Sequence, residues 1–213
     1  MKRICLSFVI CVLAVVPLQA QKFDNFVAQI GAGFNTPVGP ANSRLGNGFS
    51  FNAAAGPRFA QNASLLLDFS YNNLNVIHLT RNGFLSDTDD PFFDASGKMW
   101  SLTVNPEFEF VKAENWSWFA QGGYGVYNRR LNLKATTFSP AVVCDDWWDI
   151  CTAGIVTGDE VIGKQSTYKG GFNVGTGWTF GSSTKFFADV RYHQMFTTNQ
   201  DTQLFAFNFG VRW

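Results

Sequence analysis

The last nine residues of the chain alternate strictly between apolar side chains and small or polar ones. The odd positions from Phe205 to Trp213 are aromatic or branched apolar residues, whereas the even positions are small or polar and end with Arg212. Successive side chains of a β-strand point to opposite faces, so this segment has one apolar and one polar face. An unbroken aromatic stripe at the end of a chain favours a face that meets lipid over one that meets a soluble core.

The same period of two recurs in seven further segments. The clearest is 99–110, where six apolar residues alternate with Ser101, Thr103, Asn105, Glu107 and Glu109. Each segment has about the length needed to cross a bilayer at a tilt. The eight predicted strands span residues 26–36, 48–59, 64–74, 99–110, 117–129, 168–180, 185–196 and 204–213.

The connections between these strands alternate in length. Short connections at 60–63, 111–116 and 181–184 alternate with longer ones at 37–47, 75–98 and 131–167 and a brief one at 197–202. Membrane barrels have short periplasmic turns and longer extracellular loops, so both termini are expected in the periplasm. The pattern predicts an all-β fold, an eight-stranded antiparallel up-and-down transmembrane β-barrel.

The outward positions of the predicted strands carry aromatic residues toward both ends of the barrel. Two aromatic girdles at the membrane interfaces are typical of such barrels. The expected periplasmic girdle contains Trp118, Trp178, Phe180, Phe186 and Trp213, and the opposite girdle contains Phe34, Phe49, Tyr71, Trp100 and Phe172.

The first twenty residues predict export. Lys2 and Arg3 precede an apolar run at 4–16, and Ala20 ends a segment typical of a signal-peptide cleavage site. The run is shorter than the roughly 20 apolar residues of a spanning helix. We expect a signal peptide at 1–20 and one barrel domain at 21–213.

Composition adds two constraints. Loss of Lys2 and Arg3 leaves 14 basic against 16 acidic residues, and this balance gives no support to nucleic-acid binding. The chain is 46% hydrophobic and 16% aromatic without a helical span, which fits a membrane barrel.

Eight strands, alternating connections and the terminal aromatic residue Trp213 resemble the small outer-membrane barrels of the OmpA/OmpX type. The resemblance covers the mature chain and rests on pattern rather than on a signature sequence. It implies a monomer in the bacterial outer membrane, surrounded by lipid and lipopolysaccharide. It also implies that Trp213 is a signal read by the barrel-assembly machinery.

Eight charged residues fall on the predicted inward face. An eight-stranded barrel is only wide enough for its own side chains, and buried charges persist when they are paired. We therefore predict a paired network that plugs the interior, with a narrow or gated solute channel as the alternative. The set comprises Arg58, Arg129, Arg191 and Arg212 with Asp68, Glu107, Glu109 and Asp189.

The two histidines give little support to catalysis. Some barrels of this size are lipid-modifying enzymes that use a Ser/His pair. His78 has no adjacent acid to orient it, and His193 is interpreted as an interior hydrogen-bonding residue. We predict no enzyme activity, no catalytic residue and no cofactor, and a lipid-modifying enzyme is the least favoured alternative.

Cys144 and Cys151 lie in the longest predicted surface loop, and an oxidising compartment favours a disulfide between them. They enclose Trp147 and Trp148 beside three aspartates. Exposed aromatic residues held rigidly are good contact residues, so we predict a surface recognition tip for a sugar or a protein. The alternative is a loop that folds back and caps the barrel.

The acidic segment 86–94 offers carboxylates that could bind calcium or bridge to lipopolysaccharide through divalent ions. It lacks the spacing of an EF-hand, and a solvated acidic loop is the commoner explanation, so no metal site is predicted. The expected function is a structural or surface-interaction role, similar to adhesion, through long extracellular loops.

Overall fold

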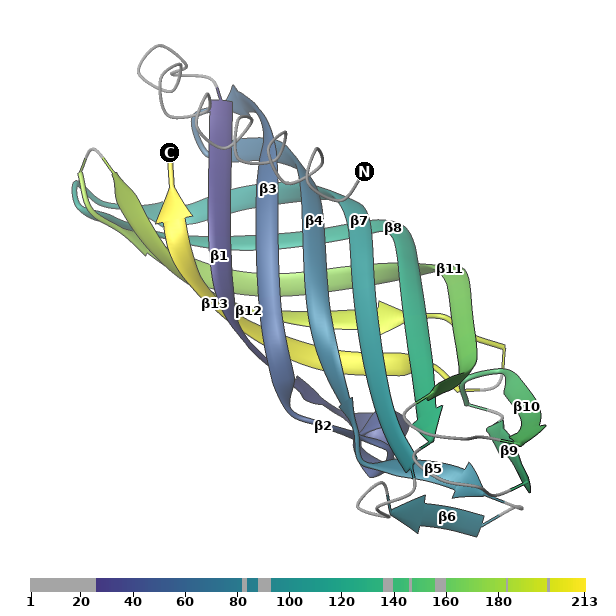
Figure 1. Ribbon diagram of the computed structural model, residues 1–213. Helices are drawn as coiled ribbons and strands as arrows, with labels where there is room; N and C mark the ends of the chain where they lie inside the picture. The colour runs from purple at the N-terminus through teal and green to yellow at the C-terminus, as the bar shows by residue number, and fades with distance from the viewer. Residues whose placement is uncertain are drawn as a thin grey trace, which may run out of the picture.

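The computed structural model describes residues 26–81, 84–87, 93–135, 140–145, 147–155, 160–182, 184–198 and 200–213. Eight long antiparallel strands in this part of the chain form a closed barrel (Figure 1). The predicted signal peptide at 1–20 lies outside the described residues. The barrel strands are β1 (Phe26–Pro37), β3 (Gly48–Ala60), β4 (Ala63–Val76), β7 (Phe93–Lys112), β8 (Trp116–Ala135), β11 (Glu160–Phe180), β12 (Lys185–Met195) and β13 (Thr202–Arg212).

Each barrel strand pairs with its neighbours in sequence, and β1 pairs with β13 to close the sheet. At this seam Ile30 lies opposite Val211 and Phe34 opposite Phe207. The fold is therefore the predicted up-and-down antiparallel barrel. A closed barrel has no free sheet edge around its circumference, which satisfies the backbone groups of every strand along its paired length.

The two ends of the barrel differ. The short turns at residues 61–62 and 113–115 and the short connection between β11 and β12 lie at one end, called here the turn end. The other, the loop end, carries the 3₁₀ helix η2 (Gly39–Ser43), the short strand β2 (Leu45–Gly46) and two hairpins. The hairpins are β5 (His78–Arg81) with β6 (Phe84–Asp87), and β9 (Pro140–Asp145) with β10 (Ile150–Ile155).

The alternation of burial follows the alternation in sequence. On β7, Ser101, Thr103 and Asn105 are buried inside the barrel, whereas Leu102 and Val104 are exposed on the outer wall. The barrel is polar inside and apolar outside, the reverse of a soluble barrel. Among the described residues no helix is long and apolar enough to cross a membrane.

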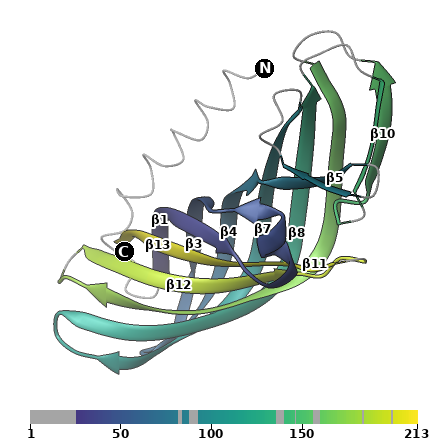
Figure 2. The ribbon, with the colours of Figure 1, turned by 90° about the horizontal axis from the view of Figure 1, so that it is seen from below.

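Three strands are longer than the sequence predicts by seven or eight residues. β7, β8 and β11 contain 20, 20 and 21 residues, and each extends beyond its predicted limit at the loop end. Figure 2 shows β8 and β11 continuing past the other barrel strands, with β10 beside them. The outer face of this extension carries Lys98, Arg130 and Lys164, so backbone pairing continues where the apolar alternation has stopped.

The interior at the loop end is apolar. Aromatic and aliphatic side chains from the barrel strands, η2, β2 and the β9–β10 hairpin form one buried cluster, which closes this end of the barrel. Its members are Ala41, Leu45, Leu74, Val76, Ala95, Met99, Tyr127, Leu131, Leu133, Trp147, Trp148, Ile150, Met195, Leu204 and Ala206.

Candidate functional site

The first charged group of the interior lies near the turn end. Arg212 forms a bidentate pair with Glu107, with Nη1 2.9 Å from Oε2, and its Nη2 lies 3.5 Å from Glu109 Oε1. Arg58 Nη2 lies 3.3 Å from the same Glu109 oxygen, and Lys112 Nζ lies 3.9 Å from the other oxygen of Glu109, Oε2. Glu107 and Glu109 meet Arg212 because all three occupy inward positions near the ends of their strands.

The second charged group lies deeper in the lumen. Arg191 Nη1 is 2.5 Å from Asp68 Oδ2, and Arg191 Nη2 is 2.8 Å from Asp189 Oδ2. Asn208 donates to the other Asp189 oxygen at 2.9 Å. The amide oxygen of Gln121, oriented toward the guanidinium, accepts from Arg191 Nε at 2.9 Å. Arg191 thus links β12 with β4 and β8 across the interior.

A neutral layer follows toward the loop end. Tyr127 Oη lies 3.2 Å from His193 Nδ1, and both residues are buried. Asn173 donates from β11 to Thr103 and Asn105 on β7, at 2.9 and 3.2 Å. These bonds cross the lumen between strands that do not pair, so this layer also fills the barrel.

Arg129 belongs to neither of the two charged groups. Its guanidinium carbon lies 4.1 Å from the Trp147 ring centroid and 4.5 Å from that of Trp148. It also donates to Thr202 Oγ1 at 2.7 Å and to the Trp147 carbonyl oxygen. Seven of the eight predicted interior charges fall in the two ion-paired groups, whereas Arg129 holds the cap at the loop end.

The prediction that Trp147 and Trp148 are exposed contact residues is wrong. Each side chain is only 1% exposed, and the two rings meet edge to face with centroids 4.6 Å apart. They lie within the apolar cluster, because the open end of a barrel offers a large apolar volume that the indole rings fill. The segment folds back over the barrel, which is the alternative considered from the sequence.

The predicted disulfide is present. Cys144 and Cys151 are bonded and lie directly opposite each other in the β9–β10 ladder. The bond closes the hairpin at the base of the turn that carries Trp147 and Trp148. It thereby limits the positions that the two rings can take over the barrel.

The candidate calcium segment, 86–94, lies largely outside the described residues, since only 86–87 and 93–94 are described. Within the described ranges, no three or more His, Cys, Asp or Glu side chains come together as a metal-binding group. Trp213 follows β13 on the outer wall and exchanges two backbone hydrogen bonds with Ala28, at 2.9 and 3.1 Å. Its role as an assembly signal stays a prediction.

Several interior residues escaped the sequence analysis. Gln121, Asn208 and Thr202 hold the charged side chains in place, and Tyr127 pairs with His193. All of them except Thr202 lie at inward positions of predicted strands, so the alternation of side chains already indicated that they face the interior. Charge alone selected the candidates, and the neutral hydrogen-bonding partners were therefore missed.

No protein-family model matches the chain, and no curated protein matches it. Several solved structures match the chain over most of its length. Neisserial surface protein A matches with a TM-score of 0.53 and 15% identity, covering 88% of this chain and 95% of that one. OprG from Pseudomonas aeruginosa matches with a TM-score of 0.50 and 10% identity, over 89% and 95%. A major outer membrane protein from Thermus thermophilus matches with a TM-score of 0.50 and 10% identity, over 88% and 98%. The chain has the fold of the small eight-stranded outer-membrane β-barrels.

Proposed function

We propose that this protein is an integral outer-membrane protein whose closed barrel holds a rigid sheet at the cell surface, where it contacts another protein or cell. The apolar outer wall supports insertion in a bilayer, and the fold is shared with proteins of the bacterial outer membrane. Because the periplasmic turns of such barrels are short, the turn end faces the periplasm and the loop end faces the outside of the cell.

The observation that carries the proposal is the free edge of β11. β12 ends opposite Gly171, and the last hydrogen bond across this boundary runs from Phe196 N to Gly170 O at 3.0 Å. Beyond it, residues 163–169 pair with β8 on one side, and no other described strand pairs with them on the other; Ile150 and Thr152 of β10 lie close to Gly163, so the open edge is 164–169. A row of unpaired backbone groups is a template for adding an extended strand from a partner.

The hydrogen bond between Phe196 and Gly170 fixes the direction in which the backbone groups of β11 point. Because the Gly170 carbonyl faces β12, the backbone groups of Tyr168, Ser166 and Lys164 face the same open side. Asn128 donates to Ser166 Oγ at 2.8 Å and to the Thr167 carbonyl, which fastens the extension to β8. The edge is therefore held in an extended form before a partner arrives.

The interior supports a structural role over transport. Two ion-paired groups, a neutral layer and the apolar cluster succeed one another along the lumen. A small barrel of this kind is filled by its own side chains. The proposal contains no catalytic step, since His193 is buried in the lumen against Tyr127 and away from lipid at the outer wall.

A cell-adhesion assay tests whether the free edge of β11 binds a partner. Ser166→Pro removes a backbone donor on the open side and leaves the β8 ladder intact, whereas Ser166→Ala keeps the donor and is the matched control. Cells that display the chain are compared for mutual aggregation and for binding to protein-coated and glycan-coated surfaces. We expect Ser166→Pro to lower binding and Ser166→Ala to retain it. Equal binding by both variants would contradict the proposed edge.

A narrow channel is the second candidate, and one observation favours it. Side-chain atoms of Asn52, Asn72 and Ser101 face the lumen without a hydrogen-bond partner in the described part of the chain. Single-channel recording of the refolded mature chain, beside Glu107→Gln with Glu109→Gln, separates the two functions. No steady conductance is expected; reproducible openings altered by the two substitutions would favour the channel.

A further inference from the structure

The outer wall changes from apolar to charged within four residues along β7 and β8. Leu102 and Val126 lie opposite each other and are exposed, as lipid-facing side chains are. The next outward pair toward the loop end is Trp100 and Asn128, and the pair after it is Lys98 and Arg130. An apolar wall, an aromatic row and a charged row thus follow one another, which is the order expected across a membrane interface.

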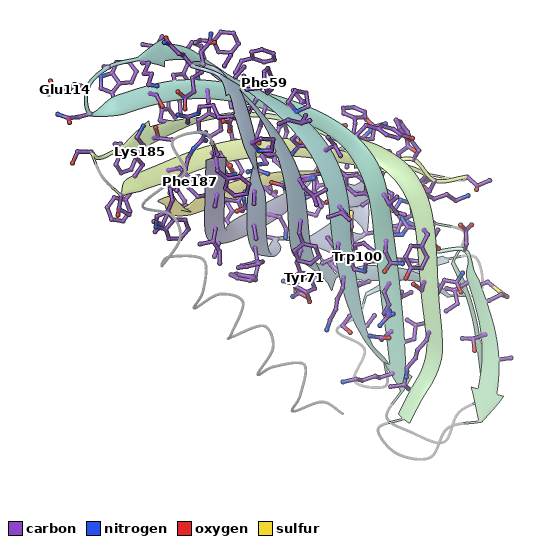
Figure 3. The ribbon with its side chains drawn as sticks, turned by 90° about the horizontal axis from the view of Figure 1, so that it is seen from above. Phe59, Tyr71, Trp100, Glu114, Lys185 and Phe187 are labelled. Carbon is purple, nitrogen blue, oxygen red and sulfur yellow. A yellow bond between two sulfur atoms is a disulfide. The ribbon has the colours of Figure 1, made fainter. Side chains whose placement is uncertain are left out.

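The aromatic row is fixed by packing. Trp100 and Tyr168 meet edge to face across Asn128, with ring centroids 5.9 Å apart. Asn128 is consequently buried although it occupies an outward position. Tyr71 lies opposite Trp100 on β4, and Figure 3 shows the two side chains close together on the outer wall. Amphipathic aromatic rings of this kind favour the level of lipid headgroups.

Three basic side chains lie immediately beyond this row. Lys98 is opposite Arg130 in the β7–β8 ladder, and Lys164 on β11 is opposite Asn132, which places it diagonally from Arg130. Directly opposite positions are about 5 Å apart and diagonal ones about 7–8 Å apart, so the three side chains can converge on one group. All three are exposed, and no carboxylate in the described ranges lies within ion-pair distance of them.

We propose that Lys98, Arg130 and Lys164 form a binding surface for the phosphate of an anionic lipid headgroup in the leaflet at the loop end. The inference rests on the membrane placement in the proposed function, and it names a lipid partner for the outer face of the extension of β7, β8 and β11. Arg130 supplies a planar guanidinium that binds phosphate oxygens in pairs, and the two lysines supply point charges on either side. Ser166, opposite Arg130, adds a hydroxyl at the same level.

A lipid headgroup fits the position better than a free phosphate ion. The three side chains stand on an exposed wall rather than in a cavity, and a single ion there would stay largely hydrated. A lipid is held in addition by its acyl chains, which lie along Leu102 and Val126 when its phosphate is level with Lys98. The aromatic row marks the depth at which the headgroup begins.

The experiment measures lipid binding by the folded full-length mature chain in detergent micelles, with native mass spectrometry to count bound lipid. The probes are diphosphorylated lipid A, dephosphorylated lipid A and inorganic phosphate. The test variant is Lys98→Gln with Lys164→Gln. The matched control, Lys112→Gln with Lys169→Gln, removes the same charge from exposed lysines outside the patch.

We expect diphosphorylated lipid A to bind the unaltered chain and the control alike, and to bind the test variant about 30-fold more weakly, from the contribution of two basic side chains near an anionic surface. Dephosphorylated lipid A and inorganic phosphate should bind weakly to all three. Equal binding of diphosphorylated lipid A by the test and control variants overturns the inference, and so does binding of dephosphorylated lipid A to the unaltered chain that is as tight as that of the diphosphorylated form. Both outcomes leave the proposed function standing, because the adhesion assay tests that function separately.

Discussion

Arg191 on β12 and Asp68 on β4 are joined across the barrel lumen by an ion pair of 2.5 Å, although 123 residues separate them in sequence. The same guanidinium binds Asp189 at 2.8 Å. Both carboxylates and the guanidinium are almost fully buried. One positive charge therefore compensates two negative charges, and the centre of the barrel depends on a single side chain.

Arg191→Met should destabilise the barrel strongly. The change leaves Asp68 and Asp189 buried without their partner, and breaking a buried pair in this way costs about 3–5 kcal/mol. Urea unfolding of the refolded chain in vesicles, followed by its heat-modifiable electrophoretic mobility, measures the loss. Adding Asp68→Asn and Asp189→Asn should restore part of the stability. An unchanged unfolding midpoint for Arg191→Met would show that the pair is dispensable.

Gly31 should tolerate no side chain. A Cβ atom there would lie 2.6 Å from Phe187 Cζ and 2.7 Å from Asn52 Oδ1, and Phe187 is itself buried in the lumen. Gly31→Ala is expected to cost about 1–3 kcal/mol through overpacking. Gly122→Ala is the control, because its nearest neighbour would be 3.4 Å away, and it should change stability by less than about 0.5 kcal/mol. Comparable losses in the two variants would contradict the close approach.

Trp147→Ala with Trp148→Ala should loosen the loop end and leave the barrel folded. The double change removes the rings that lie over Arg129 and opens the apolar cluster, which costs about 3 kcal/mol or more for a buried tryptophan. Limited proteolysis should cut faster within 140–155, while heat-modifiable mobility persists. Trp178→Ala, on the lipid-facing wall, should leave the cleavage rate unchanged. An unchanged rate in the double variant would rule out a stabilising cap.

Reduction of the Cys144–Cys151 disulfide should have a similar but smaller local effect. A bond that closes so short a loop contributes about 2–3 kcal/mol by restricting the unfolded segment. The β9–β10 hairpin forms a sheet of its own, so the barrel should keep its mobility on electrophoresis. Proteolysis within 140–155 should accelerate on adding reductant. The variant Cys144→Ser with Cys151→Ser should be cleaved fast without reductant, and reductant should not change its cleavage rate. Unfolding of the barrel on reduction would contradict a purely local role of the disulfide.

The alternation of side chains was sufficient to predict the barrel. Glu107 and Glu109 alternate with apolar neighbours, and a period of two assigns each residue to a face without knowledge of any other strand. The short turns and longer loops then fixed which strand ends share one side. All eight strands and their inward faces followed from this local property, because strand geometry depends on neighbouring residues alone.

The partners inside the barrel were decided by the tertiary structure. Arg191 meets Asp68 rather than Glu107 because the stagger of the strands sets which inward positions share a level, and no local pattern encodes that stagger. The extension of β7, β8 and β11 was missed since its outward residues, such as Lys98 and Arg130, are polar and lack the alternation in hydrophobicity. Trp147 and Trp148 carry no local mark of burial. They are buried because the apolar volume at the loop end, built by residues from distant strands, accommodates both rings.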